Sequence, residues 1–108
     1  PRGAFLVASL DGEVVACGSV KLTAPGVGWL KRMWVAETAR GLGIGRRMLE
    51  ALERQARDLG VTTLRLDTNK ALSEAIELYR SAGFREVAPF NDEPHAHYWF
   101  EKQLPRGG

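Results

Sequence analysis

Three closely spaced glycines separate two segments of the chain that differ in hydrophobic period. Residues 29–35, ahead of them, are patterned as a β-strand. Beyond them, apolar residues recur at spacings of three and four, which is the period of an amphipathic helix. The glycines are Gly41, Gly43 and Gly45, the apolar helix positions are Ile44, Met48, Leu49, Leu52, Ala56 and Leu59, and Gly60 follows where the helix should end. A glycine-rich turn between a strand and a helix restricts the chain to folds that mix both elements.

Turn signals divide the remaining sequence into further strands and one more helix. Asp11-Gly12 between two apolar runs is typical of a β-hairpin, and Ala24-Pro25-Gly26 predicts a second turn. The second helix has Leu72, Ala75, Ile76 and Tyr79 on one face, with Gly83 just past its end. The predicted strands are residues 4–9, 13–22, 29–35, 62–67, 84–87 and 97–104.

The predicted order of elements is β-β-β-α-β-α-β-β. Strands joined through helices favour parallel pairing, whereas the first three strands and the last two favour antiparallel pairing. We therefore predict an α/β (α+β) fold with a mixed, mostly antiparallel sheet and helices on its faces. A chain of 108 residues has room for one domain, which we place at residues 1–104, and residues 105–108 are expected to be a frayed tail.

Composition and charge exclude several classes of protein. A chain that is 44% hydrophobic and 26% charged is typical of globular domains and not of disordered ones. Cys17 is the single cysteine, so no internal disulfide can form, and a reducing, cytoplasmic compartment is expected. No apolar run approaches the roughly 18 residues of a membrane span, and we expect no membrane partner. The net charge of +2 does not decide between an anionic small molecule and nucleic acid as a ligand.

The glycine-rich turn has the features of a phosphate site. Glycine allows positive φ and lets a ligand come close to the backbone. The first turn of the following helix leaves N–H groups without partners at the positive end of the helix dipole. Arg40, Arg46 and Arg47 add positive charge beside it. The spacing matches neither the nucleoside-triphosphate loop nor the dinucleotide fingerprint, and a turn that binds no ligand remains an alternative.

Two motifs resemble those of the GNAT superfamily of N-acetyltransferases. Residues 31–35 followed by Arg40–Arg46 are similar to the cofactor motif of that superfamily, R/Q-x-x-G-x-G/A after a strand. Residues 75–84 are similar to its signature A-x-x-L-Y-x-x-x-G-F, and residues 98–102, Tyr-Trp-Phe-Glu-Lys, resemble the last strand of one bacterial branch. The resemblance covers nearly the whole chain, and two motifs in the right order are more specific than either alone.

The resemblance implies an enzyme that moves an acetyl group from acetyl-coenzyme A directly to a primary amine of a small molecule or a peptide. The family's sheet splays open beside residues 33–35, and the pantetheine arm enters the gap. Asn69 would lie near that arm, and Tyr79 near the sulfur, where it would be the catalytic acid that protonates the departing thiolate. The implied cofactor-binding residues are Met33, Trp34, Val35, Arg40, Gly41, Leu42, Gly43, Ile44, Gly45, Arg46, Asn69 and Tyr79. No metal site is implied.

Simpler roles compete with these, and two positions depart from the family pattern. Tyr79 can serve core packing alone, and Asn69 can cap a helix. Related sequences often carry a glutamate base where this chain has Trp29, and many carry an asparagine where it has Leu72. The usual base therefore cannot be carried over. The candidates near the motifs are Glu37, Asp67, Asp92, Glu93, His95 and His97, and ordered water would also serve.

Family members usually begin with another strand and one or two helices that help to wall the acceptor site. This chain begins at Pro1, without methionine, and its first predicted strand corresponds to the second strand of the family. This is expected if the first elements are missing or if the domain was cut from a longer protein. Its first strand would be an open edge, which favours pairing in a homodimer.

Two rival functions differ from the enzyme in class. One is a regulatory module that binds acetyl-coenzyme A without turnover, which the missing glutamate makes reasonable. The other is a nucleic-acid-binding domain that uses the arginines around the first helix. Acidic residues interleave with those arginines and no nucleic-acid motif accompanies them, so we expect no nucleic-acid partner. The arginines are Arg40, Arg46, Arg47, Arg54 and Arg57.

Overall fold

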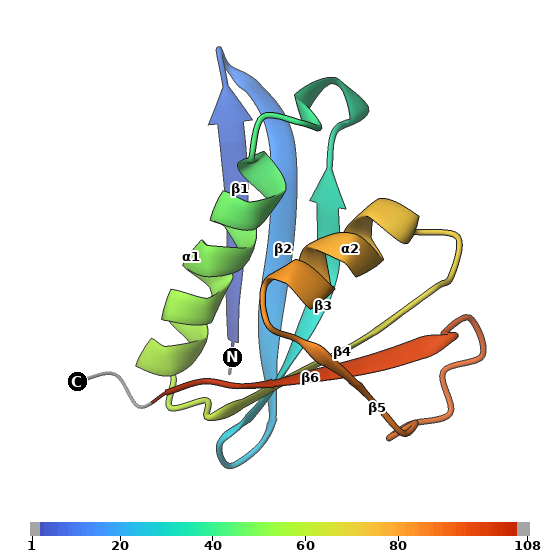
Figure 1. The fold of residues 1–108 in the computed structure, drawn as a ribbon. Coiled ribbons are helices and arrows are strands. Elements are labelled where there is room, and N and C mark those ends of the chain that lie inside the picture. The colour runs from blue at the N-terminus through green and yellow to red at the C-terminus, as the bar shows by residue number, and fades with distance from the viewer. Residues whose placement is uncertain (1–2, 106–108) are drawn as a thin grey trace.

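A computed structural model describes residues 3–105, and three residues of the predicted tail, 106–108, lie outside that range. Within it, a six-stranded sheet carries two α-helices (Figure 1). The elements are β1 (Gly3–Leu10), β2 (Glu13–Ala24), β3 (Val27–Val35), the short 3₁₀ helix η1 (Glu37–Ala39), α1 (Ile44–Asp58), β4 (Thr63–Thr68), α2 (Ser73–Ser81), β5 (Arg85–Val87) and β6 (Tyr98–Gln103).

The strand order in the sheet is β1-β2-β3-β4-β6-β5. The only parallel pair among residues 3–105 is β3 with β4, and the other neighbours are antiparallel. The predicted element order and the mixed, mostly antiparallel sheet are therefore confirmed. The short helix η1 was not predicted, because three residues carry no measurable period. The observed strand ends differ from the predicted ones by at most two residues.

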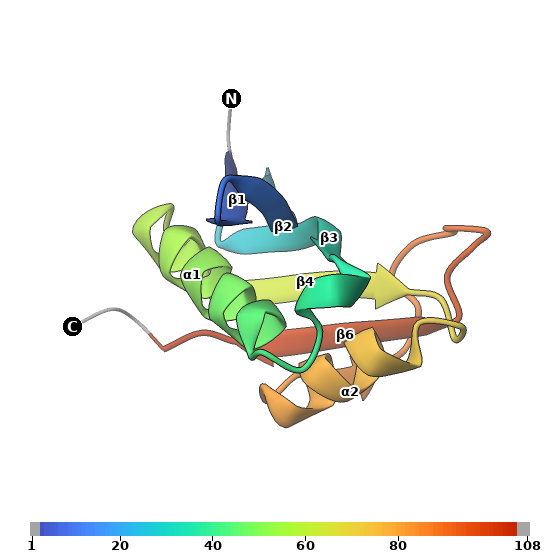
Figure 2. The ribbon, with the colours of Figure 1, turned by 90° about the horizontal axis from the view of Figure 1, so that it is seen from above.

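Both helices lie on the same face of the sheet (Figure 2). A side chain at Gly18 of β2 would place its Cβ 2.6 Å from the Leu52 side chain of α1, so glycine lets this helix approach closely. Tyr79 of α2 packs on Phe100 of β6, and all these buried side chains form one core. The sequence predicted helices on the faces of the sheet without deciding how they are distributed, and the opposite face carries none from the described residues.

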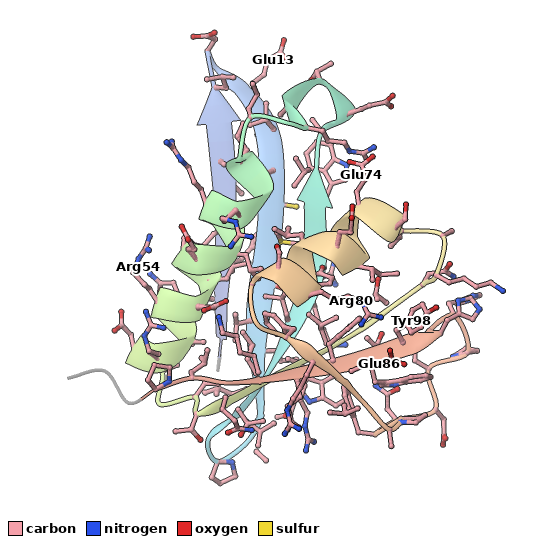
Figure 3. All side chains as sticks on the ribbon, viewed as in Figure 1. Glu13, Arg54, Glu74, Arg80, Glu86 and Tyr98 are labelled. Atoms are coloured by element: carbon pink, nitrogen blue, oxygen red, sulfur yellow. The ribbon has the colours of Figure 1, made fainter. Side chains whose placement is uncertain are left out.

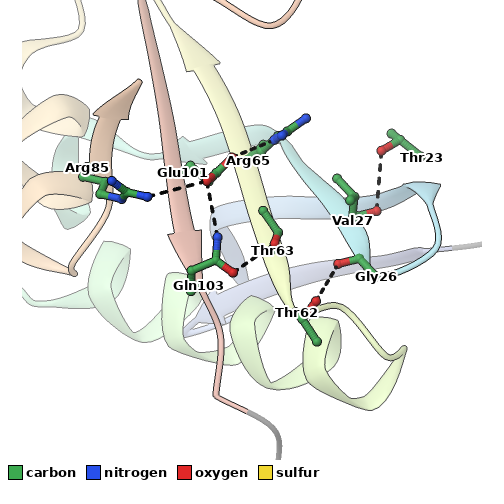
Figure 4. Close-up of polar contacts among 9 residues, drawn as sticks. All are labelled: Thr23, Gly26, Val27, Thr62, Thr63, Arg65, Arg85, Glu101 and Gln103. Atoms are coloured by element: carbon green, nitrogen blue, oxygen red, sulfur yellow. Dashed lines mark hydrogen bonds and ion pairs between the residues drawn. The ribbon is translucent and has the colours of Figure 1, made fainter. Parts of the chain in front are cut away.

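Polar contacts close the end of the sheet that lies away from the glycine-rich turn (Figure 4). Thr63 Oγ1 donates to Gln103 Oε1 at 3.1 Å, and Arg65 Nε donates to Glu101 Oε2 at 2.9 Å. These cross-strand contacts join β4 to β6 where β3 also pairs, so this end of the sheet is closed and the opposite end is free to open.

Candidate functional site

β3 and β4 separate soon after they meet. Their pairing covers only Val27–Trp29 against Thr63–Arg65. Further along β3, an extra residue opposite Gly18 makes a β-bulge, and Arg32 has a φ of 57°. The two strands no longer pair beyond Trp29, as the resemblance implied, and two cavities border the opening.

The first cavity, of about 490 Å³, lies between the end of β3, the glycine-rich turn and the start of α2. The first turn of α2 contributes Ser73, Glu74 and Ala75 to its wall. Leu42 is not among its lining residues, and the Leu42 side chain is 60% exposed. Nine of the predicted cofactor residues do line it: Met33, Trp34, Val35, Arg40, Gly41, Gly43, Ile44, Gly45 and Arg46.

The three glycines of the turn have two different roles. Gly41 and Gly43 have φ of 85° and 76°, and a Cβ at either position would meet no atom within 4 Å. Their backbone is therefore open to a ligand. Gly45 has no such φ, and a Cβ there would lie 3.2 Å from Leu78 and 3.4 Å from Val35. The third glycine lets α1 begin in contact with α2 and β3.

The start of α1 presents free backbone donors to this cavity. Gly43 is the residue before the helix, and the first amide that bonds back to the turn is that of Arg47, whose N–H donates to the Gly43 carbonyl at 3.1 Å. The N–H groups of residues 44–46 consequently have no backbone acceptor in the described chain. Together with the helix dipole they form a site suited to phosphate.

Two arginines beside the turn are held by α2. Arg46 donates to Ser81 Oγ at 2.5 Å, and Arg40 lies 3.6 Å from the Glu74 carboxylate, in an exposed ion pair. Glu74, labelled in Figure 3, thus places a negative charge on the wall of a cavity that is otherwise suited to an anion. The sequence analysis did not single out Glu74, since only the fold brings it close to the turn.

The second cavity, of about 480 Å³, lies on the other side of Met33 and Leu72, which line both cavities. Asn69 and Tyr79, predicted near the cofactor arm and sulfur, line this second cavity and not the first. The lining residues come from four segments: Leu30, Lys31, Arg32 and Met33; Leu66, Asp67, Thr68 and Asn69; Leu72 and Tyr79; and Glu93, His95 and Ala96.

Tyr79 is 5% exposed, and its ring contacts Phe84 and Phe100. Burial disfavours the phenolate and raises the pKa of Tyr79 to about 12. The phenol is neutral near pH 7, as a tyrosine with an ordinary pKa also is, so it carries a proton that it can donate. The packing role and the acid role are compatible in this position.

Asn69 uses both ends of its amide within the protein. Its Oδ1 accepts from the Ala71 N–H at 2.8 Å, and its Nδ2 donates to the His95 carbonyl at 3.0 Å. The residue that precedes α2 is Leu72, and no side chain caps the helix there. The alternative role of Asn69 as a helix cap is therefore wrong, because its oxygen closes the turn ahead of the helix instead.

Three of the candidate bases, Asp67, Glu93 and His95, line the second cavity. Glu37, Asp92 and His97 do not. Trp29, at the position of the usual glutamate, packs edge-on against Phe90, with ring centroids 5.3 Å apart, and lines neither cavity. Trp29 cannot act as a base in place of the usual glutamate, since indole does not accept a proton near neutral pH.

Residues 3–105 contain no group of three or more His, Cys, Asp or Glu side chains arranged to hold a metal ion. None of their helices is both long enough and apolar enough to cross a membrane.

The Acetyltransferase (GNAT) family model matches residues 1–84. An IAA acetyltransferase of Azospirillum brasilense is 47% identical over 87 residues, which are 80% of this chain and 57% of that protein. An aminoglycoside N(6')-acetyltransferase type 1 of Stenotrophomonas maltophilia is 32% identical over 77% of this chain and 60% of its own length. The chain thus spans a little more than half the length of these relatives.

Solved structures show the same fold. A Klebsiella pneumoniae protein assigned as an acyl-CoA N-acyltransferase superposes with a TM-score of 0.85 at 34% identity, over 95% of this chain and 73% of that one.

Proposed function

The chain belongs to the GNAT acetyltransferase family, and on that premise we propose that it transfers an acetyl group from acetyl-coenzyme A directly to a primary amine, as the acyl-coenzyme A-dependent N-acetyltransferase part of its protein. The observation that carries this proposal is the pair of cavities that meet at Met33 and Leu72 where β3 and β4 separate. One cavity is suited to an anionic cofactor, and the other offers proton acceptors to an amine.

The cofactor would occupy the first cavity. Its pyrophosphate would accept hydrogen bonds from the free amides at the start of α1, with Arg40 and Arg46 beside them. Its pantetheine arm would run along Met33–Val35, where β3 has no partner on the side of β4. A related fold supports this assignment: a GNAT protein of Elizabethkingia anophelis with acetyl-coenzyme A bound has a TM-score of 0.79 at 19% identity, over 95% of this chain and 77% of its own.

The chemistry would take place where the cavities meet. The neutral amine attacks the thioester carbonyl, the C–N bond forms, and the C–S bond breaks as Tyr79 protonates the departing sulfur. The proton lost by the amine goes to a base or to water, and Tyr79 is reprotonated from solvent. A free N–H on the β3 edge would polarise the carbonyl. Direct transfer is supported because Cys17 lines neither cavity and its thiol donates to the Arg32 carbonyl.

The test is a calorimetric titration with acetyl-coenzyme A of the parent, Gly43→Asp and Gly60→Asp. Both glycines have positive φ and open space around a Cβ, but they lie at opposite ends of α1. The control therefore carries the same charge change and a similar backbone strain. We expect Gly43→Asp to weaken binding about a hundredfold by placing a carboxylate at the phosphate site, a loss of two charge-assisted hydrogen bonds, and Gly60→Asp to bind like the parent.

Equal weakening by both variants, or no binding by a folded parent, would contradict the cofactor site. Thiol release over a panel of spermidine, kanamycin, L-lysine and a short peptide would then test turnover. Binding without turnover would favour the regulatory module. Gly45→Asp is unsuitable as a probe, because its Cβ would press on Leu78.

The proposal also covers the oligomeric state and the cellular compartment. β1 is an edge strand of the sheet, and we propose that it pairs with a second copy in a homodimer. Light scattering at micromolar concentration measures this, and a monomer would contradict it. The free Cys17 supports a reducing, cytoplasmic compartment.

A further inference from the structure

Four consecutive residues at the end of β4 hold the loop between β5 and β6. Each makes one hydrogen bond to that loop, either from its backbone or from its side chain. In chain order, Asp67 Oδ2 accepts from Asn91 Nδ2 at 3.0 Å, the Thr68 carbonyl accepts from the His97 N–H at 2.8 Å, Asn69 Nδ2 donates to the His95 carbonyl at 3.0 Å, and the Lys70 N–H donates to His97 Nδ1 at 3.1 Å. These four hydrogen bonds therefore hold the loop against the wall of the second cavity.

Three of the residues between these hydrogen bonds line the cavity. They are Glu93, His95 and Ala96, and Tyr79 lines it too. The Asn91 side chain that donates to Asp67 is itself held in place, because its Oδ1 accepts from Trp99 Nε1 at 2.9 Å. His97 is excluded as a reacting group by its own contact, since its Nδ1 is the acceptor of a backbone amide and it does not line the cavity.

Asn69 makes the contact nearest to the reacting side chains. Its Nδ2 is the donor to the carbonyl of His95 itself, whereas Asp67 and Lys70 hold the loop at its two ends. Its Oδ1 is fixed by the Ala71 N–H, which sets the orientation of the amide. Asn69 thus helps to fix the His95 backbone at the cavity, together with Glu93, whose Oε1 accepts from the His95 N–H at 3.4 Å.

We propose that Glu93, His95 and Ala96 of this loop form the acceptor-amine wall, that His95 takes the proton of the incoming amine, and that Asn69 is the positioning residue that holds His95 there. This rests on the proposed acetyl transfer. A primary amine arrives mostly as an ammonium ion and must lose one proton before its nitrogen can attack. An imidazole nitrogen can accept that proton and, because His95 is exposed, pass it to water. The carboxylates of Glu93 and Asp67 attract the ammonium ion, and each already accepts a hydrogen bond from the loop, Glu93 from the His95 N–H and Asp67 from Asn91.

The experiment compares the full chain with Asn69→Asp, His95→Gln and Gln103→Ala. Asn69→Asp keeps the oxygen that accepts from Ala71 but replaces the donor to His95 with a second oxygen. Gln103 is the matched control, because it is also an amide with two hydrogen bonds and lies at the far end of the same strand pair (Figure 4). Acetyl-coenzyme A affinity is measured by calorimetry, and kcat and KM for the best amine of the panel are measured as functions of pH.

We expect Asn69→Asp, which displaces both the wall and His95, to raise the KM of the amine about tenfold, as for one lost hydrogen bond, and to lower kcat, with unchanged affinity for acetyl-coenzyme A. We expect His95→Gln to lower kcat about a hundredfold and to remove the acidic limb of the kcat/KM profile. Gln103→Ala should match the parent in all three quantities.

Weaker cofactor binding by Asn69→Asp would instead make Asn69 a contact of the pantetheine arm and overturn the proposal. An unchanged KM, or an acidic limb that survives in His95→Gln, would overturn it as well. In each of those cases the parent still binds acetyl-coenzyme A and turns over. A parent that does neither would refute the acetyltransferase itself, and the inference with it.

Discussion

The two cavities have nearly the same volume, about 490 and 480 Å³, but they offer different chemical groups to a ligand. The first contains a backbone site for an anion, which is a glycine-rich turn with open space beside it and a helix start with free N–H groups. The second is lined by the ionisable residues Asp67, Glu93 and His95, and its loop is held in place by the side chains and backbone of residues 67–70.

This difference suits two different ligands. A backbone site can recognise a phosphate whatever the neighbouring side chains are, so it fits a cofactor that is the same for every member of a family. A side-chain site changes with every substitution in the loop, so it fits an acceptor that differs between members. The comparison therefore predicts that substitutions around the two cavities affect different kinetic quantities.

Tyr79→Phe provides the largest expected effect and tests whether chemistry belongs to the second cavity. Removal of the hydroxyl deletes the proton donor to the leaving sulfur while the ring keeps its contacts with Phe84 and Phe100. We expect kcat to fall between about a hundredfold and a thousandfold, with unchanged affinity for acetyl-coenzyme A. Steady-state kinetics and calorimetry measure the two quantities, and a normal kcat would reduce Tyr79 to a packing residue.

The same residue predicts a pH dependence of stability. Because burial raises the pKa of Tyr79 to about 12, from 10.0, the unfolded chain ionises first as pH rises. Its stabilising contribution is complete below pH 10 and is lost between pH 10 and 12, which lowers the free energy of unfolding by roughly 2–3 kcal/mol.

Urea denaturation of the parent and Tyr79→Phe at pH 8 and pH 11.5 measures this effect. Lysines titrate in both proteins, so the difference between them isolates Tyr79. Parallel losses of stability would show that the phenol is better solvated than the structure indicates.

Glu74→Gln gives the smallest effect and sharpens the description of the first cavity. The Glu74 carboxylate lies near the phosphate site and pairs with Arg40. Its neutralisation removes a repulsion and frees the arginine, so we expect acetyl-coenzyme A to bind about two- to threefold more tightly at low salt, and equally in 0.5 M salt. Calorimetry at the two salt concentrations measures this, with Glu86→Gln, which pairs with Arg80 away from the lining, as the control. Weaker binding would mean that Glu74 contacts the cofactor favourably.

Much of the first cavity could be predicted from sequence because its parts are local. The turn, the helix start and the end of the preceding strand are neighbours along the chain, and nine predicted residues line one cavity. Less of the second could be predicted, because its lining residues come from four separate segments. Asn69 illustrates the difference: its place before a helix suggested a cap, the family resemblance suggested a cofactor contact, and its observed partner is His95, a residue of a distant loop.

The sequence by itself determined the order of the strands and helices, the mixed sheet and the glycine-rich turn. Hydrophobic period and glycine spacing are patterns within a few consecutive residues, so they can be recognised without the fold. Only the tertiary structure decided that both helices share one face, that β3 and β4 part after Trp29, and that Leu72 stands between two cavities. These features depend on which distant segments pack and hydrogen-bond together, and such contacts are selected by the free energy of the whole fold and not by any local pattern.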